Sequence, residues 1–274
     1  MQNNKMEIVV TMLLKSTLAH FGEEKLSTTS LCRRQEFVIA GKKTPIPVYS
    51  GNALRGICRR LLMKDFFELA EIKSIGVKFY HTLFTGGALK SGVSLSTMAE
   101  KTQLVTLIPP LSLFGAAIGD TILQGKMQFG ICYPICKELN EYNKQQSDIS
   151  YREFITDTFH VRKDDTKSEV LSLSDEERDE NPTQMKYDFE GLAAGTQLET
   201  HIVIENATEI EIACMARVMN LLREKSKIGG KNSIGYGNIE VDYKPFDDVP
   251  YVNFIKDNAE AIRAYVAELS EKLK

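Results

Sequence analysis

Residues 7–19 read EIVVTMLLKSTLA, and residues 50–62 read SGNALRGICRRLL. The first stretch is rich in apolar and β-branched residues, which predicts a long, largely buried strand. The second stretch opens with a plausible helix cap, and its apolar residues then recur at helical spacing. It predicts an amphipathic helix that continues to about residue 69. A sheet therefore starts near the beginning of the chain, and a helix follows it.

The same elements recur later in the chain. Strands are predicted over residues 126–132, 197–204 and 238–243, and a second helix over residues 207–224. The order fits a βαββαβ unit of the ferredoxin-like or RRM-like class. We expect one α+β domain over residues 1–274, ending in a helix over residues 252–273.

Two segments depart from this core pattern. Residues 21–44 are rich in Gly, Ser, Thr and charge, and we expect an exposed, finger-like loop there. Residues 148–187 mix acidic and basic side chains with few large apolar groups, which predicts a protruding inserted arm.

Composition excludes several classes of protein. The chain has 274 residues, of which 43% are hydrophobic and 26% charged, as is typical of a soluble globular protein. An apolar run of about 18 residues is absent, so we expect no membrane span. The polar N-terminus carries no recognisable signal peptide, and we expect a cytoplasmic protein. A net charge of -3 argues against coating nucleic acid by bulk charge, but it is compatible with a local basic groove.

Catalytic and metal-binding motifs find little support. The five cysteines show no paired framework, so we expect reduced thiols. Cys132 and Cys136 lack a second pair of ligands, and we expect no metal and no cofactor. A Gly-x-Ser-x-Gly elbow and a P-loop are both absent. The sequence therefore favours a binding protein over an enzyme.

The stretch GGKNSIGYG at residues 229–237 is the strongest binding signal. Its glycines can expose backbone N–H groups, and Lys231, Asn232 and Ser233 add side-chain donors, so the loop can hold a polyanion. The alternative is a helix C-cap followed by a tight turn, which explains Gly229 and Gly230 but not the Gly235–Gly237 pair.

In a βαββαβ unit this loop can lie beside the first helix. The cationic residues that would then border one groove are Arg33, Arg34, Arg55, Arg59, Lys225, Lys227 and Lys231. Guanidinium groups and backbone amides contact phosphates without reading bases. We therefore expect the groove to bind an RNA backbone regardless of its sequence.

Several motifs resemble those of one family. IP at residues 46–47 followed by GNALRG at residues 51–56 resembles the "IPGSSLRG" entry to the first helix in the CRISPR-associated RAMP superfamily, which adds Asn52 to the expected RNA-binding residues. The loop at residues 229–237 resembles the glycine-rich loop of that superfamily in place and form. Residues 113–115 (LFG) and 191–196 (GLAAGT) agree with it as well.

Within the superfamily, the chain looks like the repeated backbone subunit, and residues 31–34 and 83–92 favour the type IV version. This resemblance implies a hand-like shape with an RRM-like palm, finger insertions and a thumb at about residues 151–187. It also implies four kinds of partner: guide RNA (crRNA), target nucleic acid paired to that guide, copies of itself in a head-to-tail filament, and other CRISPR effector subunits.

One departure from the family pattern concerns cleavage. Type III backbone subunits that cut target RNA carry an aspartate before the first helix, and residues 21–51 contain none. We therefore expect no target cleavage and no catalytic residue. The alternative is an endoribonuclease of the same superfamily that depends on Glu36 or on a histidine such as His20 or His81.

Overall fold

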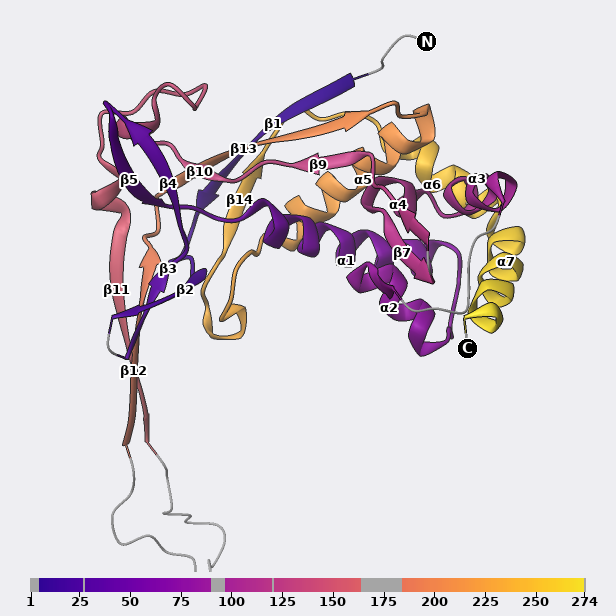
Figure 1. Ribbon diagram of the computed structural model, residues 1–274, viewed down its shortest axis with the longest axis horizontal. Helices are drawn as coiled ribbons and strands as arrows, with labels where there is room; N and C mark the ends of the chain where they lie inside the picture. Colours follow the sequence, from indigo (N-terminus) through magenta and orange to yellow (C-terminus); the bar gives the residue numbers. More distant parts are fainter. Residues whose placement is uncertain (1–4, 27, 90–96, 120, 164–183, 274) are drawn as a thin grey trace, which may run out of the picture.

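The computed structural model describes residues 5–26, 28–89, 97–119, 121–163 and 184–273 (Figure 1). It mixes antiparallel sheets with helices, so the α+β class predicted from the sequence is confirmed. The main sheet has the order β10-β13-β1-β14, and β9 also pairs with β13. Its strands are β1 (Lys5–Leu14), β9 (Met127–Phe129), β10 (Tyr133–Pro134), β13 (Gln197–Glu205) and β14 (Ile239–Asp242).

Two helices cover one face of this sheet. They are α1 (Gly51–Leu69) and α5 (Glu209–Lys225), which pack against each other. Alternate β1 residues, including Val10 and Met12, join the same buried cluster as Leu54 of α1 and Met215 of α5. Burial of these apolar side chains is the main force that fixes the helices on the sheet.

A second group of elements surrounds the far end of α1. It consists of α2 (Val77–Thr85), α3 (Met98–Leu107), α4 (Pro109–Phe114), the small sheet β6 (Gly87–Leu89), β7 (Ala116–Gly119) and β8 (Thr121–Leu123), and the C-terminal helices α6 (Val249–Asp257) and α7 (Ala259–Lys272). Figure 1 shows these elements gathered on the right of the molecule.

The opposite side carries two β arms. Strands β11 (Ile155–Lys163) and β12 (Gln184–Leu192) form a long antiparallel ladder that extends away from the main sheet (Figure 1). Strands β2 (Phe21–Leu26) and β3 (Thr29–Cys32) add to the base of this arm, and β4 (Arg34–Ile39) and β5 (Lys42–Pro47) form a separate hairpin. Short 3-10 turns, η1 (Lys137–Leu139) and η2 (Tyr151–Phe154), precede β11. The arm expected over residues 148–187 includes residues 164–183, which lie outside the described residues.

Three sequence predictions need correction. Residues 21–44 were expected to form a loop, but the structure pairs them as strands, with Ala40 (φ 48°) and Gly41 (φ 77°) making the tight turn between β4 and β5. The few apolar residues of this segment, such as Phe37 and Ile46, form a small separate core with Leu139, and the surrounding polar residues hid their strand pattern.

The strand predicted over residues 7–19 ends at Leu14. Beyond it the chain leaves the main sheet, and Leu18 and Ala19 pair instead with Leu192 and Gly230. The helix predicted over residues 252–273 is two helices, since Asn258 breaks the helical backbone (φ -105°, ψ 12°) and its side-chain amide donates to the Phe254 carbonyl.

Candidate nucleic-acid interface

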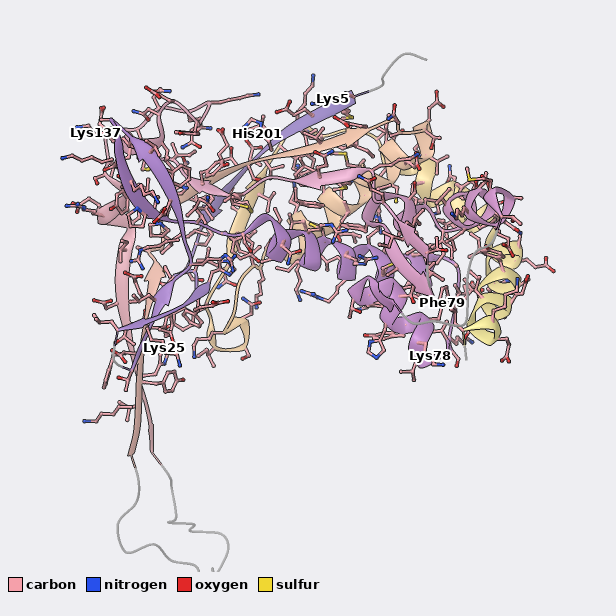
Figure 2. The ribbon with its side chains drawn as sticks, in the orientation of Figure 1. Lys5, Lys25, Lys78, Phe79, Lys137 and His201 are labelled. Carbon is pink, nitrogen blue, oxygen red and sulfur yellow. The ribbon has the colours of Figure 1, made fainter. Side chains whose placement is uncertain are left out.

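A groove of about 540 Å³ lies along the first half of α1, and we call it the α1 groove. Its walls come from α1, from α2 and from the loop between α5 and β14. The structure brings four of the sequence-predicted residues together along it: Asn52, Arg55, Arg59 and Gly229. In Figure 2, the labelled Lys25 on β2 lies at the lower left of the molecule and Lys78 on α2 at the lower right.

Helix α1 begins at one end of the groove. Ser50 caps it, because the serine hydroxyl accepts a hydrogen bond from the Ala53 amide at 3.2 Å. Within the described residues, the amides of Gly51 and Asn52 donate to no group. Unpaired amides together with the helix dipole favour an anion at a helix N-terminus, so this end of the groove suits a phosphate.

His20 lies at the same end of the groove. Its Nε2 accepts a hydrogen bond from the Ser50 amide at 3.2 Å, and its ring packs on that of Tyr49. Burial, assisted by the charge of Arg33, lowers the pKa of His20 to about 4. The ring is therefore neutral at pH 7, where it is a weak general base.

Arg55 and Arg59 hold the wall of the groove together. Arg59 is 3% exposed, and its guanidinium donates to the carbonyls of Leu83 (2.6 Å) and Gly115. Arg55, which is half-buried, donates to the Phe114 carbonyl. These carbonyls end α2 and α4, where the helix dipole favours a cation.

Burial and the nearby charge of Arg55 lower the pKa of Arg59 to about 10, so it is still protonated at pH 7. Because the Arg59 guanidinium already donates to buried protein carbonyls, it is not available for the phosphate contact that we expected of it. We correct that expectation and treat Arg59 as a residue that stabilises the fold.

Arg60 is the groove cation that sequence reasoning missed. It is exposed, it lines the groove, and no ion pair joins it to another described residue. The signal was in the helix itself, since the buried row of α1 includes Leu54, Cys58 and Leu62. At about 100° per residue, position 60 lies on the side opposite position 58.

Backbone amides of the glycine-rich loop are mostly used within the protein. Gly230 donates to the Ala19 carbonyl (2.8 Å), and Gly237 donates to the Thr17 carbonyl (2.9 Å). The glycines were expected to expose their N–H groups, and these contacts correct that expectation. The amides that make no hydrogen bond among the described residues belong to Lys231, Asn232 and Ser233 instead.

Glycine is nevertheless required in this loop for close packing. Gly237 has φ 73°, and a Cβ there would lie 1.9 Å from the Ile228 carbonyl oxygen. A Cβ at Gly229, with φ 74°, would lie 2.5 Å from a Leu18 methyl carbon. Both positions therefore serve close packing, whereas the C-cap that the alternative assigned to Gly229 is Ser226 (φ 51°).

The side chain of Lys231 points towards the β11–β12 arm. Its ammonium lies 4.4 Å from the ring centre of Tyr187 and 5.1 Å from that of Phe189. His160 stacks on both rings, and the Tyr236 hydroxyl lies 2.9 Å from its Nε2. This aromatic cluster attaches the arm to the loop and fixes where the amides of residues 231–233 lie.

The remaining predicted residues have mixed positions. Arg34 is ion-paired with the buried Glu190 at 2.6 Å, which commits its charge to the protein, whereas Arg33 is exposed beside His20. Lys225 ends α5, and Lys227 pairs with Asn238, but neither lines the α1 groove. Ser233 is exposed on a 3-10 turn, and the side-chain amide of Asn232 holds the loop carbonyls.

The described part of the chain contains no side-chain cluster suited to a metal ion, and its thiols are buried. Within it, His, Cys, Asp and Glu side chains form no cluster of three that could hold a metal ion. All five cysteines are buried thiols, and burial raises the pKa of Cys32 and Cys132 to about 12. Among the described helices, none is both long and apolar enough to cross a membrane.

Of three comparisons with known proteins, the one with solved structures finds a chain of similar fold. No protein-family model matches the sequence, and no curated protein matches it. A chain of a solved structure described as "Type IV-B CRISPR Complex" matches this one with a TM-score of 0.67 and 19% sequence identity. The match covers 87% of this chain and 90% of that chain, so the two proteins share their fold over nearly their whole length.

Proposed function

We propose that this chain is the repeated backbone subunit of a type IV CRISPR effector complex, and that it binds guide RNA through the phosphates without reading the bases. The subunit works in the cytoplasm, presents the guide for pairing with a target nucleic acid, and does not cleave that target. One observation carries the proposal: Asn52 at the start of α1, the exposed Arg60 and Gly229 of the glycine-rich loop line one groove.

The fold supports the same assignment. The strand order β9-β13-β1-β14, with α1 after β1 and α5 after β13, supports the RRM-like palm that we assign to it in this proposal. In this proposal β11 and β12 form the thumb, β4 and β5 form a finger, and the solved chain of similar fold comes from a CRISPR complex.

The groove chemistry favours binding over cleavage. A His20 pKa of about 4 leaves little driving force for proton abstraction at neutral pH. Glu36, another candidate for catalysis, forms an exposed ion pair with Lys43 at 3.0 Å on the β4–β5 hairpin. In this proposal neither His20 nor Glu36 acts as a general base on the RNA.

Copies of the chain assemble head to tail in this proposal, which gives an open helical array along the RNA. The thumb bridges neighbours, and partner subunits cap the ends. Deleting residues 162–184 is expected to leave a folded monomer that assembles poorly in electron micrographs. Filaments of normal length from that deletion would refute the role of the thumb.

The test is binding and stability of RNA on the purified full chain. We expect single-stranded RNAs of equal length and different sequence to bind with similar Kd, and precursor and target RNAs to remain intact with or without magnesium. Protein isolated from cells should carry RNA with a uniform footprint. Discrete fragments that disappear in His20→Ala or Glu36→Ala would instead establish the endoribonuclease.

A further inference from the structure

A second hollow continues from the α1 groove along the other half of α1. It measures about 650 Å³ and lies between the C-terminal half of α1 and α2, and we call it the aromatic groove. Tyr80 and Phe84 line both hollows, so the two are continuous. A strand that crosses the α1 groove therefore meets the aromatic groove next.

Three rings form a stack in this groove. The ring centres of Phe67 and Phe84 lie 5.8 Å apart at 14°, and those of Phe84 and Tyr80 lie 4.4 Å apart at 18°. Phe84 is thus the middle ring, and Tyr80 ends the stack with 46% of its surface exposed. A near-parallel stack that ends in an exposed ring is a surface on which a further planar group can add.

The two hollows differ in the groups that line them. The α1 groove offers Arg60 and unpaired amides, which suit phosphate. The aromatic groove also contains carboxylates, and those of Glu68 and Glu71 pair with Lys64 and Arg263 at 3.6 Å each. These ion pairs, with Lys73 also on the wall, leave the groove without excess negative charge, and its distinctive feature is the ring stack, which suits an uncharged base.

From this geometry we propose that the aromatic groove is a nucleobase site, in which one unstacked base of the bound single-stranded RNA stacks on Tyr80 while its phosphates stay beside Arg60. The inference rests on the proposed function and adds to it a contact that involves a base. Stacking tolerates any base, because every base has a π-face, so the site is compatible with binding that ignores sequence.

The experiment measures Kd by fluorescence anisotropy for the full chain with two labelled 20-nucleotide probes: a uridine RNA and an abasic oligomer with the same phosphates. We expect Tyr80→Ala to weaken binding of the uridine RNA by about 5- to 150-fold per stacked base and to leave the salt dependence unchanged. Binding of the abasic oligomer should not change. Tyr80→Trp should restore the affinity, and Tyr142→Ala, which removes an equally exposed tyrosine (47%), is the matched control.

The outcomes separate the two proposals. If Tyr80→Ala binds the uridine RNA as tightly as the wild type while Arg60→Ala binds it less tightly, the base site is refuted and the phosphate groove stands. If the wild type binds neither probe, the proposed function itself fails. A Tyr80→Ala protein that keeps its RNA affinity but loses self-assembly would also refute the base site, because it would make the groove a protein interface.

Discussion

Arg59 and Arg60 are neighbours in sequence with opposite expected roles. Arg59→Ala removes the hydrogen bonds to the Leu83 and Gly115 carbonyls and leaves both acceptors without their charged donor. At about 1.5 to 3 kcal/mol for a hydrogen bond to a charged group, two of them amount to about 3 to 6 kcal/mol of unfolding free energy. We expect Tm to fall by roughly 5 to 10 °C.

Arg60→Ala is expected to show the reverse pattern. Because its side chain is exposed and has no ion-pair partner among the described residues, Tm should change by less than about 2 °C. RNA affinity should fall for every sequence, and the slope of log K against log salt should decrease by about 0.7 to 0.9. Thermal melting and anisotropy titrations at several salt concentrations measure both effects.

The comparison refutes the reasoning if the two variants behave alike. An Arg59→Ala protein as stable as the wild type would mean that the carbonyl contacts do not hold α2 and α4 in place. An Arg60→Ala protein with an unchanged salt slope would mean that Arg60 contacts no phosphate.

Two further predictions concern the loop and its surroundings. Gly237→Ala should lower the free energy of unfolding in urea by more than about 2 kcal/mol, because the new Cβ would meet the Ile228 carbonyl. Gly235→Ala, whose Cβ would meet open space at φ 95°, should lower it by only about 1 to 2 kcal/mol. Equal losses in the two variants would argue against the packing account. His20 has a pKa of about 4 in the folded protein, below its unfolded value of 6.5. Its contribution to the free energy of unfolding is therefore fully present above pH 6.5 and is lost as pH falls towards 4. Allowing for partial exposure, the wild type should lose about 1 to 2 kcal/mol more than His20→Gln over this range, and parallel pH profiles would contradict the shift.

The sequence predicted the core elements with strong periodicity. Alternation in β1 buries Val10, Met12 and Leu14, and the helix predicted over residues 207–224 is observed as Glu209–Lys225. Both patterns depend on a single apolar face, which is the feature that a sequence displays most directly.

Elements that depend on tertiary contacts were missed. Helix α3 has only one buried residue, Leu104, so it shows little periodicity, although Thr97 and Glu100 form a capping box that marks its start. Helix α4 begins at Pro109 and Pro110, because proline is well tolerated in the first turn of a helix.

At the candidate site, the sequence identified the right segments but not the right atoms. It named Arg59 and the glycines, whereas the structure leaves Arg60 and the amides of residues 231–233 unpaired among the described residues. The periodicity of α1 indicates that Arg60 is exposed, but burial of Arg59 depends on α2 and α4 packing against one flank of α1, which that periodicity does not show.

The central claim is that phosphates are held by unpaired amides at two places in the chain. Amide hydrogen exchange of the full chain, with and without a 20-nucleotide single-stranded RNA, tests it most directly. We predict that exchange slows at residues 51–52 and 231–233 on addition of RNA, whatever its sequence. Protection confined to other parts of the molecule, such as the β4–β5 hairpin, with no change at these five amides, would contradict the account.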